Sequence, residues 1–218
     1  SGAAGGLVTK NPKYRQKRLL VQRHDTASDF AWSADVLAAY VATVRGHCAA
    51  DVERLPRGRK PRQLPPGRSI VAFRVDVAQP SSWYNGFTYL DVLSHEAVGE
   101  FIKVTHEAYR KEFAEHFGGR VPGILTDEPH HHGYGRGVFG DATGCLPWTD
   151  KLPQVFRKRY GYDLLDRLLD VQFDPADGRP ATARYHYHDC TTHLFVDAFA
   201  RQIGQWCERH KMLHTGHV

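Results

Sequence analysis

The sequence predicts an α/β fold in which helices and parallel strands alternate, together with a small antiparallel β unit. Three observations support this prediction. Residues 19–80 contain strand-like apolar runs, of which the last alternates with period two. Apolar residues recur at three- and four-residue steps from Ser94, and a short apolar run then separates two helical stretches. A right-handed crossover would place the two strands of the second part side by side in one sheet. Both a doubly wound sheet and a (β/α)8 barrel satisfy this pattern.

The antiparallel unit is expected to contain several strands between residues 19 and 80. The last of them alternates best, because Val71 and Phe73 point to one face of a strand while Arg74 and Asp76 point to the other. Arg45-Gly46 predicts a hairpin turn between the second strand and the third. The expected strands cover residues 19–22, 36–44, 49–55 and 70–78.

A basic, proline-rich loop spans residues 54–68 of this unit. Residues 1–80 hold 14 Lys and Arg against 6 Asp and Glu, although the net charge of the whole chain is only +5. Proline and glycine exclude a helix or a central strand here, and the loop lacks the interleaved aromatic residues of a nucleic-acid surface. We therefore expect a solvated loop and no nucleic-acid partner.

A helix is expected from Ser94, which can cap its N-terminus, to the Gly118-Gly119 pair. Residues 121–126 then form a short apolar run bounded by turn residues, which is typical of a buried parallel strand. The helix would bury one apolar stripe. The expected members of the stripe are Val98, Phe101, Ile102, Thr105, Ala108, Tyr109, Phe113 and Phe117.

The rest of the chain continues the alternation of helix and strand. Residues 130–150 are rich in glycine and aromatic residues and predict a loop. Short helices are expected at residues 155–160 and 163–171, a longer helix at 182–210 and a strand at 212–218.

Composition and motifs exclude several functional classes. No stretch approaches the roughly 18 apolar residues that a membrane helix needs, so no membrane partner is expected. The glycines after residue 132 lack the G-x-G-x-x-G spacing, and the 4 cysteines form no C-x-x-C pair, so neither dinucleotide binding nor thiol chemistry is expected. The chain lacks an initiator Met and stops within a strand, so we expect a fragment of a longer soluble protein whose localisation signal is out of view.

The strongest chemical signal is the acidic pair Asp127-Glu128 at the end of the short apolar strand. In parallel α/β folds, active sites are built at the carboxyl ends of the strands. A carboxylic acid that is partly desolvated there has a raised pKa and can act as a general acid. The alternative is structural, because either residue could cap the next loop or pair with an arginine.

Four short motifs occur in one order between residues 84 and 218. They are Thr88-Tyr89-Leu90-Asp91-Val92-Leu93, Gly123-Ile124-Leu125-Thr126-Asp127-Glu128-Pro129, Leu152-Pro153 with Phe156 to Asp163, and Thr215-Gly216-His217-Val218. Together they resemble bacterial glycoside hydrolases with a (β/α)8, or TIM-barrel, catalytic domain, and most closely the α-L-rhamnosidase-like family 106 enzymes. This resemblance implies a partial (β/α)8 barrel, with residues 1–18 and 81–218 as barrel segments and residues 19–80 as an inserted antiparallel β unit.

The resemblance also implies a function, namely hydrolysis of O-glycosidic bonds in plant or microbial polysaccharides or glycosides, with Glu128 as general acid/base. The usual motif in such enzymes is Asn-Glu-Pro, so Asp127 replaces an asparagine that contacts the sugar. Acidic residues of family 106 enzymes can hold a calcium ion that orients the sugar, which would make Glu128 a metal ligand instead. Hydrolysis normally takes a second carboxylate, which we expect beyond Val218, so the chain alone is expected to be inactive.

A carbohydrate substrate needs aromatic faces for its C–H surfaces and short polar partners for its hydroxyl groups. For each candidate the alternative role is structural: the aromatic residues can belong to the core, and Asp91 can cap the backbone. The candidates for substrate binding are Tyr84, Asn85, Tyr89, Asp91, Trp148 and His217, with Trp83 beside them in sequence.

Two other functions remain open. A metal-dependent hydrolase would use Asp127 with histidines, because zinc is bound by His together with Asp or Glu. A non-catalytic carbohydrate-binding module would keep the fold without the chemistry. The histidines considered as ligands are the consecutive His130, His131 and His132, then His214 and His217, whereas His186 and His188 with Asp189 fit a helix surface better.

Overall fold

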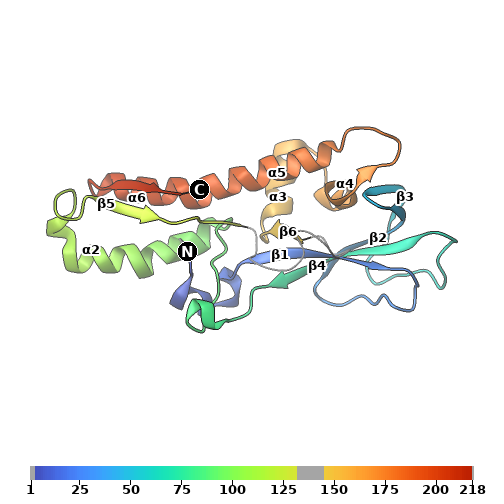
Figure 1. The fold of residues 1–218 in the computed structure, drawn as a ribbon, viewed down its shortest axis with the longest axis horizontal. Coiled ribbons are helices and arrows are strands. Elements are labelled where there is room, and N and C mark those ends of the chain that lie inside the picture. The colour runs from blue at the N-terminus through green and yellow to red at the C-terminus, as the bar shows by residue number, and fades with distance from the viewer. Residues whose placement is uncertain (1–2, 132–144, 218) are drawn as a thin grey trace. The chain divides into compact units, whose positions relative to one another are not determined.

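Figure 1 shows the computed structural model of the protein, which describes residues 3–131 and 145–217. The chain forms two compact units. The sheet unit comprises residues 18–76 and 145–190, and the helical unit comprises residues 3–17, 77–131 and 191–217. Within these ranges every helix is too short or too polar to cross a membrane.

The sheet unit is built on a mixed six-stranded sheet with the strand order β6-β1-β4-β2-β3-β7. Strand β2 pairs antiparallel with both β3 and β4, whereas β3 pairs in parallel with the short β7. The strands are β1 (Lys17–His24), β2 (Val36–Arg45), β3 (Cys48–Arg54), β4 (Ser69–Val77), β6 (Cys145–Trp148) and β7 (Asp174–Pro175).

The strands expected between residues 19 and 80 are confirmed, and so is the hairpin turn. Arg45 pairs with Cys48 across the turn, and Gly46 adopts the left-handed conformation with φ +56°. Burial differs from the expected pattern, because neighbouring residues such as Val71 and Ala72 are both fully buried. One face of the sheet packs in a cluster around Phe30, and on β2 the hydroxyl group of Tyr40 donates to the carbonyl of Leu165.

The basic loop at residues 54–68 is held by specific contacts. Lys60 Nζ donates to the carbonyl of Ala27 at 2.9 Å, and Arg57 donates to the carbonyl of Val36 at 2.7 Å. The indole N–H of Trp32 donates to the carbonyl of Arg59 at 2.7 Å. Lys60 and Arg57 thus donate to backbone carbonyl groups, which gives part of the basic excess a structural role.

Three helical segments of the sheet unit lie where helices were expected. They are α3 (Leu152–Tyr160), the short 3-10 segment η6 (Leu164–Asp166) and α4 (Leu168–Gln172). Helix α3 ends at Gly161, whose φ of +80° supplies the left-handed C-cap. Helix α5 (Thr182–Phe195) begins in this unit, and its residues from Thr191 onward belong to the helical unit.

The helical unit contains a two-stranded parallel sheet with helices on either side of it in sequence. Strand β5 (Gly123–Thr126) pairs with β8 (Leu213–Gly216), so that Gly123 lies opposite Leu213 and Thr126 opposite Gly216. The predicted parallel pair is therefore confirmed. The other elements are α1 (His95–Phe101), α2 (Glu107–Phe113), α6 (Gln202–Arg209), the π-helical segments η4 (Ile102–His106) and η7 (Val196–Arg201), and the 3-10 turns η1 (Gly6–Lys10), η2 (Pro12–Tyr14), η3 (Ser82–Tyr84) and η5 (Ala114–His116).

The π-helical segment η4 changes which residues of the long helix are buried. Ser94 caps the helix as predicted, because its hydroxyl group accepts a hydrogen bond from the N–H of Ala97. A π turn adds about one residue per turn and so rotates the following face. As a result His106 is only 5% exposed, whereas Tyr109, expected in the buried stripe, is 61% exposed.

The core of the helical unit is centred on Trp206 of α6. Its indole ring is 2% exposed and packs in a cluster with Val98, Ile102 and Phe199. The indole N–H donates to Glu107 Oε1 at 2.7 Å. This hydrogen bond, with a second from Arg110, lowers the pKa of Glu107.

Burial of His106 predicts a loss of stability in acid. Desolvation, helped by nearby His214, lowers the pKa of His106 from 6.5 to about 4, while Glu107 acts in the opposite direction. Between these two values the unfolded chain binds a proton that the folded chain does not, so stability present at pH 7 is lost as the pH falls. The difference between the pKa values corresponds to about 3 kcal/mol.

We expect the free energy of unfolding to fall less steeply between pH 7 and pH 4.5 in a His106→Phe variant than in the wild type. The difference between the two proteins should be about 2 to 3 kcal/mol, measured by urea denaturation at both pH values. Carboxyl groups titrate in both proteins, so their contribution cancels in the comparison. Parallel pH curves would show that His106 is not held neutral.

The prediction of a partial (β/α)8 barrel with an inserted β unit is wrong. Strands β6 and β7, from the segment expected to form the barrel, join β1 to β4 in one mixed sheet, so strands and helices do not alternate as they do in a barrel. Residues 145–148, expected to be part of a loop, form β6, and this strand joins the six-stranded sheet next to β1. The parallel β5–β8 pair therefore forms a separate sheet of its own.

Candidate functional site

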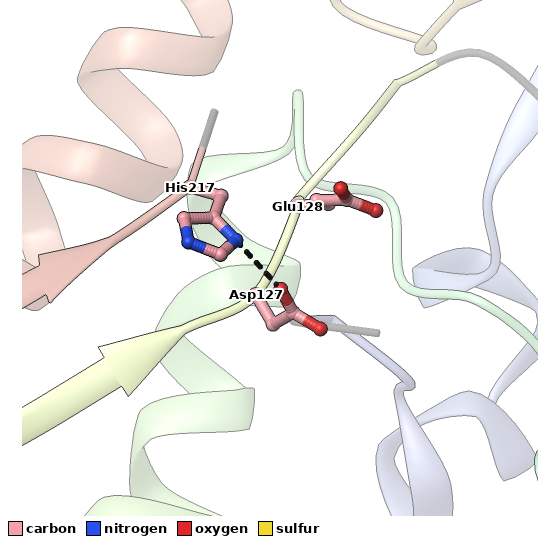
Figure 2. A group of neighbouring side chains, drawn as sticks. All are labelled: Asp127, Glu128 and His217. Carbon is pink, nitrogen blue, oxygen red and sulfur yellow. Dashed lines mark hydrogen bonds and ion pairs between the residues drawn. The ribbon is translucent and has the colours of Figure 1, made fainter.

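The acidic pair and His217 lie at one edge of the small parallel sheet. Asp127 and Glu128 directly follow β5, and His217 directly follows β8. Because the two strands are parallel and Thr126 lies opposite Gly216, their carboxyl ends meet (Figure 2). The backbone N–H of His217 donates to the carbonyl of Thr126 at 3.0 Å, which extends the pairing by one residue. The strands thus position all three side chains.

Asp127 and His217 are joined directly. The distance between His217 Nδ1 and Asp127 Oδ1 is 3.1 Å, a hydrogen bond when Nδ1 carries the proton (Figure 2). One donor atom from each of Asp127, Glu128 and His217 lies within 4.8 Å of the others. The side chains of His217 and Asp127 are 71% and 56% exposed, in contrast to the partly desolvated setting that the sequence led us to expect.

The backbone of Glu128 is left-handed, with φ +48°. A non-glycine residue in this region costs about 1 to 3 kcal/mol, and such residues cluster at functional sites. In an extended strand, successive side chains point to opposite faces. The left-handed turn interrupts that alternation directly after Asp127, which allows both carboxyl groups to reach the same neighbourhood as His217.

A second pair of polar residues, Thr126 and His214, lies within the two strands that lead to the site. Thr126 is 6% exposed, and its hydroxyl oxygen lies 3.1 Å from His214 Nε2 on the neighbouring strand. Burial lowers the pKa of His214, so its imidazole is neutral at pH 7. Neutral His214 and Thr126 together fix the last residues of the two strands on which Asp127 and His217 depend.

A small hollow of about 280 Å³ adjoins His217. Its walls combine apolar side chains of the long helix, Phe195 and Phe199, with Thr126 and His214 of the two strands. Gly216 also lines it. A Cβ atom at this position would lie 1.9 Å from the carbonyl oxygen of Thr126, so only glycine allows the strands to approach this closely.

Tyr84 and Tyr89, predicted to bind substrate, pack against each other. Their ring centroids are 5.8 Å apart, and Tyr89 is only 1% exposed. The His130 ring stacks on Tyr89 at 4.3 Å, and the N–H of His130 donates to the Tyr89 hydroxyl group at 3.1 Å. Tyr89 therefore anchors the segment that follows Glu128.

Of the other predicted substrate residues, Asp91 and Trp148 are buried and Asn85 is exposed. Asp91 is 2% exposed, and its carboxylate accepts a hydrogen bond from the N–H of Leu93 at 3.1 Å, which is the capping role considered from the sequence. Asn85 follows η3 with φ +53° and is exposed. Trp148 is a buried residue of β6 in the sheet unit.

The histidines considered as zinc ligands are dispersed. His130 stacks on Tyr89, His131 lies 5.7 Å from the ring of Phe195, and His132 lies outside the described residues. Among residues 3–131 and 145–217, the acids and histidines close enough to share a metal ion are Asp127, Glu128 and His217.

His186 and Asp189 are held within the sheet unit. The Tyr162 hydroxyl group lies 2.9 Å from His186 Nδ1, and the ring of Tyr160 stacks on His186 at 4.2 Å. Arg159 donates to the carboxylate of Asp189 at 3.0 Å. These contacts join α3 to α5, which agrees with the helix-surface interpretation.

Two features of the site were missed from the sequence. The left-handed backbone of Glu128 has no sequence signal, because glutamate is not a residue that favours it. The Thr126–His214 pair had a weak sequence signal, since each is a polar residue inside a short apolar strand. No protein-family model matches the chain, and no curated protein sequence is significantly similar to it.

Proposed function

We propose that this chain is part of the catalytic region of a glycoside hydrolase, with Glu128 as the general acid/base. The observation that supports this most is the meeting of Asp127, Glu128 and His217 at the carboxyl ends of two parallel strands. Glycoside hydrolysis needs carboxyl groups in an open cleft that can admit a sugar. The motifs around these residues, which resemble those of family 106 enzymes, support the same reaction.

The two carboxyl groups have different surroundings and therefore different roles. Glu128 makes no hydrogen bond to any residue in the described ranges, so its carboxyl group is available to a substrate. Asp127 is held by His217, which keeps it in one orientation. We assign proton transfer to Glu128 and sugar orientation to Asp127.

In the proposed reaction, the bond between the anomeric carbon and the glycosidic oxygen breaks, and the electron pair stays on that oxygen. The oxygen takes the proton of Glu128 and leaves as an alcohol. Water then supplies a hydroxyl group to the anomeric carbon, and its remaining proton passes to a carboxylate. The partly buried ring of Phe195, in the hollow beside His217, offers an apolar surface for the C–H face of a sugar ring.

The experiment is a hydrolysis assay on a panel of aryl glycosides that includes α-L-rhamnoside. It is carried out with the 218-residue chain and with the longest natural polypeptide that contains it. We expect the longer polypeptide to release the phenol from one class of sugar, with a bell-shaped dependence on pH and no loss of rate after treatment with a chelator, and the 218-residue chain alone to be inactive. Failure of both polypeptides on every sugar would overturn the proposal.

A second candidate function is metal-dependent hydrolysis. It is favoured by the close donor atoms of Asp127, Glu128 and His217, because a histidine with two carboxylates is a common ligand set for divalent cations. In such a site the metal would lower the pKa of a bound water molecule. This mechanism differs from the first in requiring the ion for the reaction.

For the metal-dependent candidate we expect one divalent ion per chain, measured by elemental analysis after dialysis, and its loss in a His217→Ala variant. His193→Ala is the matched control, because His193 is an exposed histidine outside the site. Equal metal content in the wild type and His217→Ala, or hydrolysis that survives complete removal of metal, would exclude this candidate.

A further inference from the structure

A second and larger cavity lies within the helical unit. Its volume is about 530 Å³, which is in the range of small-molecule sites. The walls come from the helix around η4, from β5 and from α6, and they include Phe101, His106, Phe117, Ile124 and Trp206. None of the side chains that line it carries a formal charge at pH 7. The cavity is therefore apolar, with very few polar groups.

His106 is the unusual residue of this cavity. It is 5% exposed, and its Nδ1 atom is buried without a hydrogen-bond partner among residues 3–131 and 145–217. The rings of Phe101 and Trp206 meet it edge-on at 5.5 and 5.1 Å. A buried polar group without a partner is costly, and each such group calls for an explanation.

The backbone places His106 there by means of a π turn. An uninterrupted α-helix would continue the stripe through Thr105 and Tyr109, whereas η4 puts His106 against Trp206. π turns are rare and occur frequently at functional sites. The sequence thus keeps an irregular turn whose effect is to bury an imidazole in an apolar wall.

We propose that this cavity binds a small planar ring that carries one hydroxyl group, a phenol-like molecule, with the hydroxyl group hydrogen-bonded to His106. Aromatic walls favour a planar ring through edge and face contacts. Burial keeps the imidazole neutral at pH 7, so it offers one donor and one acceptor, and a hydroxyl group can satisfy either. A charged ligand is disfavoured because no opposite charge lines the cavity. The proposal does not depend on the glycoside hydrolase function.

The test is calorimetric titration of the whole 218-residue chain with phenol and with toluene, which has the same ring without the hydroxyl group. One net hydrogen bond to His106 should make phenol bind about 5- to 10-fold more tightly than toluene. In a His106→Phe variant this preference should fall below about twofold. His193→Phe, which changes an exposed histidine outside the cavity, should keep the wild-type preference.

A second measurement covers the case in which His106→Phe does not fold. In the wild-type chain labelled with ¹⁵N-histidine, phenol should shift the ring-nitrogen resonances of His106 and leave those of His217 unchanged. Equal affinity for phenol and toluene, absence of binding, or a shift confined to other histidines would each overturn the proposal.

Discussion

Replacing Glu128 with glutamine should lower the rate of glycoside hydrolysis by about two to four orders of magnitude, which is the usual contribution of general acid–base catalysis. Glutamine keeps the size and polarity of the side chain but has no proton to transfer. Since Glu128 is exposed and forms no described hydrogen bond, the substitution should leave the fold intact. The decrease should therefore appear in kcat, with KM changed little.

The leaving group of the substrate distinguishes proton transfer from other roles. A dinitrophenyl glycoside departs without protonation, so its hydrolysis should suffer far less in Glu128→Gln than that of a phenyl glycoside. Glu112→Gln is the matched control, because it removes an exposed carboxyl group of α2 away from the site. An equal loss on both leaving groups would assign Glu128 to metal binding or substrate orientation instead.

Replacing Gly216 with alanine should destabilise the helical unit by about 3 kcal/mol or more, at the upper end of the cost of overpacking. The added Cβ atom would lie 1.9 Å from the carbonyl oxygen of Thr126 and 3.0 Å from its nitrogen. Both atoms belong to the backbone of β5, so they cannot move without breaking the β5–β8 pairing. The variant should unfold at a lower urea concentration than the wild type.

Gly99→Ala is the matched control for this prediction. This substitution should raise the free energy of unfolding, whereas Gly216→Ala should lower it. Gly99 lies within α1, and its added Cβ atom would meet only the flexible end of Gln202 at 3.5 Å. Alanine within a helix is more stable than glycine by up to about 1 kcal/mol. If Gly216→Ala were as stable as the wild type, the close approach of β5 and β8 described here would be incorrect.

The sequence was sufficient to predict most elements, the β2–β3 hairpin and the β5–β8 pair, but not the place of β6 in the larger sheet. Strand-like apolar runs located β1 to β4, and the Ser94 cap located α1. The sequence did not predict β6, because a short segment that contains Pro147 has a weak strand signal. Its place at the edge of the sheet accommodates this proline, since an edge strand can leave one side unpaired. Pairing of β6 with β1 is a long-range contact that no local pattern records.

The candidate site was partly predictable, because local patterns located the two strands that it follows. Asp127, Glu128 and His217 follow strands whose parallel arrangement could be inferred, so their meeting at one edge could be predicted as well. Aromatic residues were less informative, because a ring that packs in the core and a ring that stacks on a sugar have the same sequence signal. The burial of Tyr89 and Trp148 depends on tertiary packing.

The glycines at the two ends of the β5–β8 pair set a limit on how this protein can evolve. A side chain at position 123 would meet the carbonyl oxygen of Leu213 at 2.6 Å, much as one at position 216 would meet Thr126. Natural relatives that retain this sheet should therefore have glycine at both positions, even where the surrounding helices have diverged. A relative with a larger residue at position 216 would have lost the alignment of Asp127 with His217, however well it preserved the acidic pair.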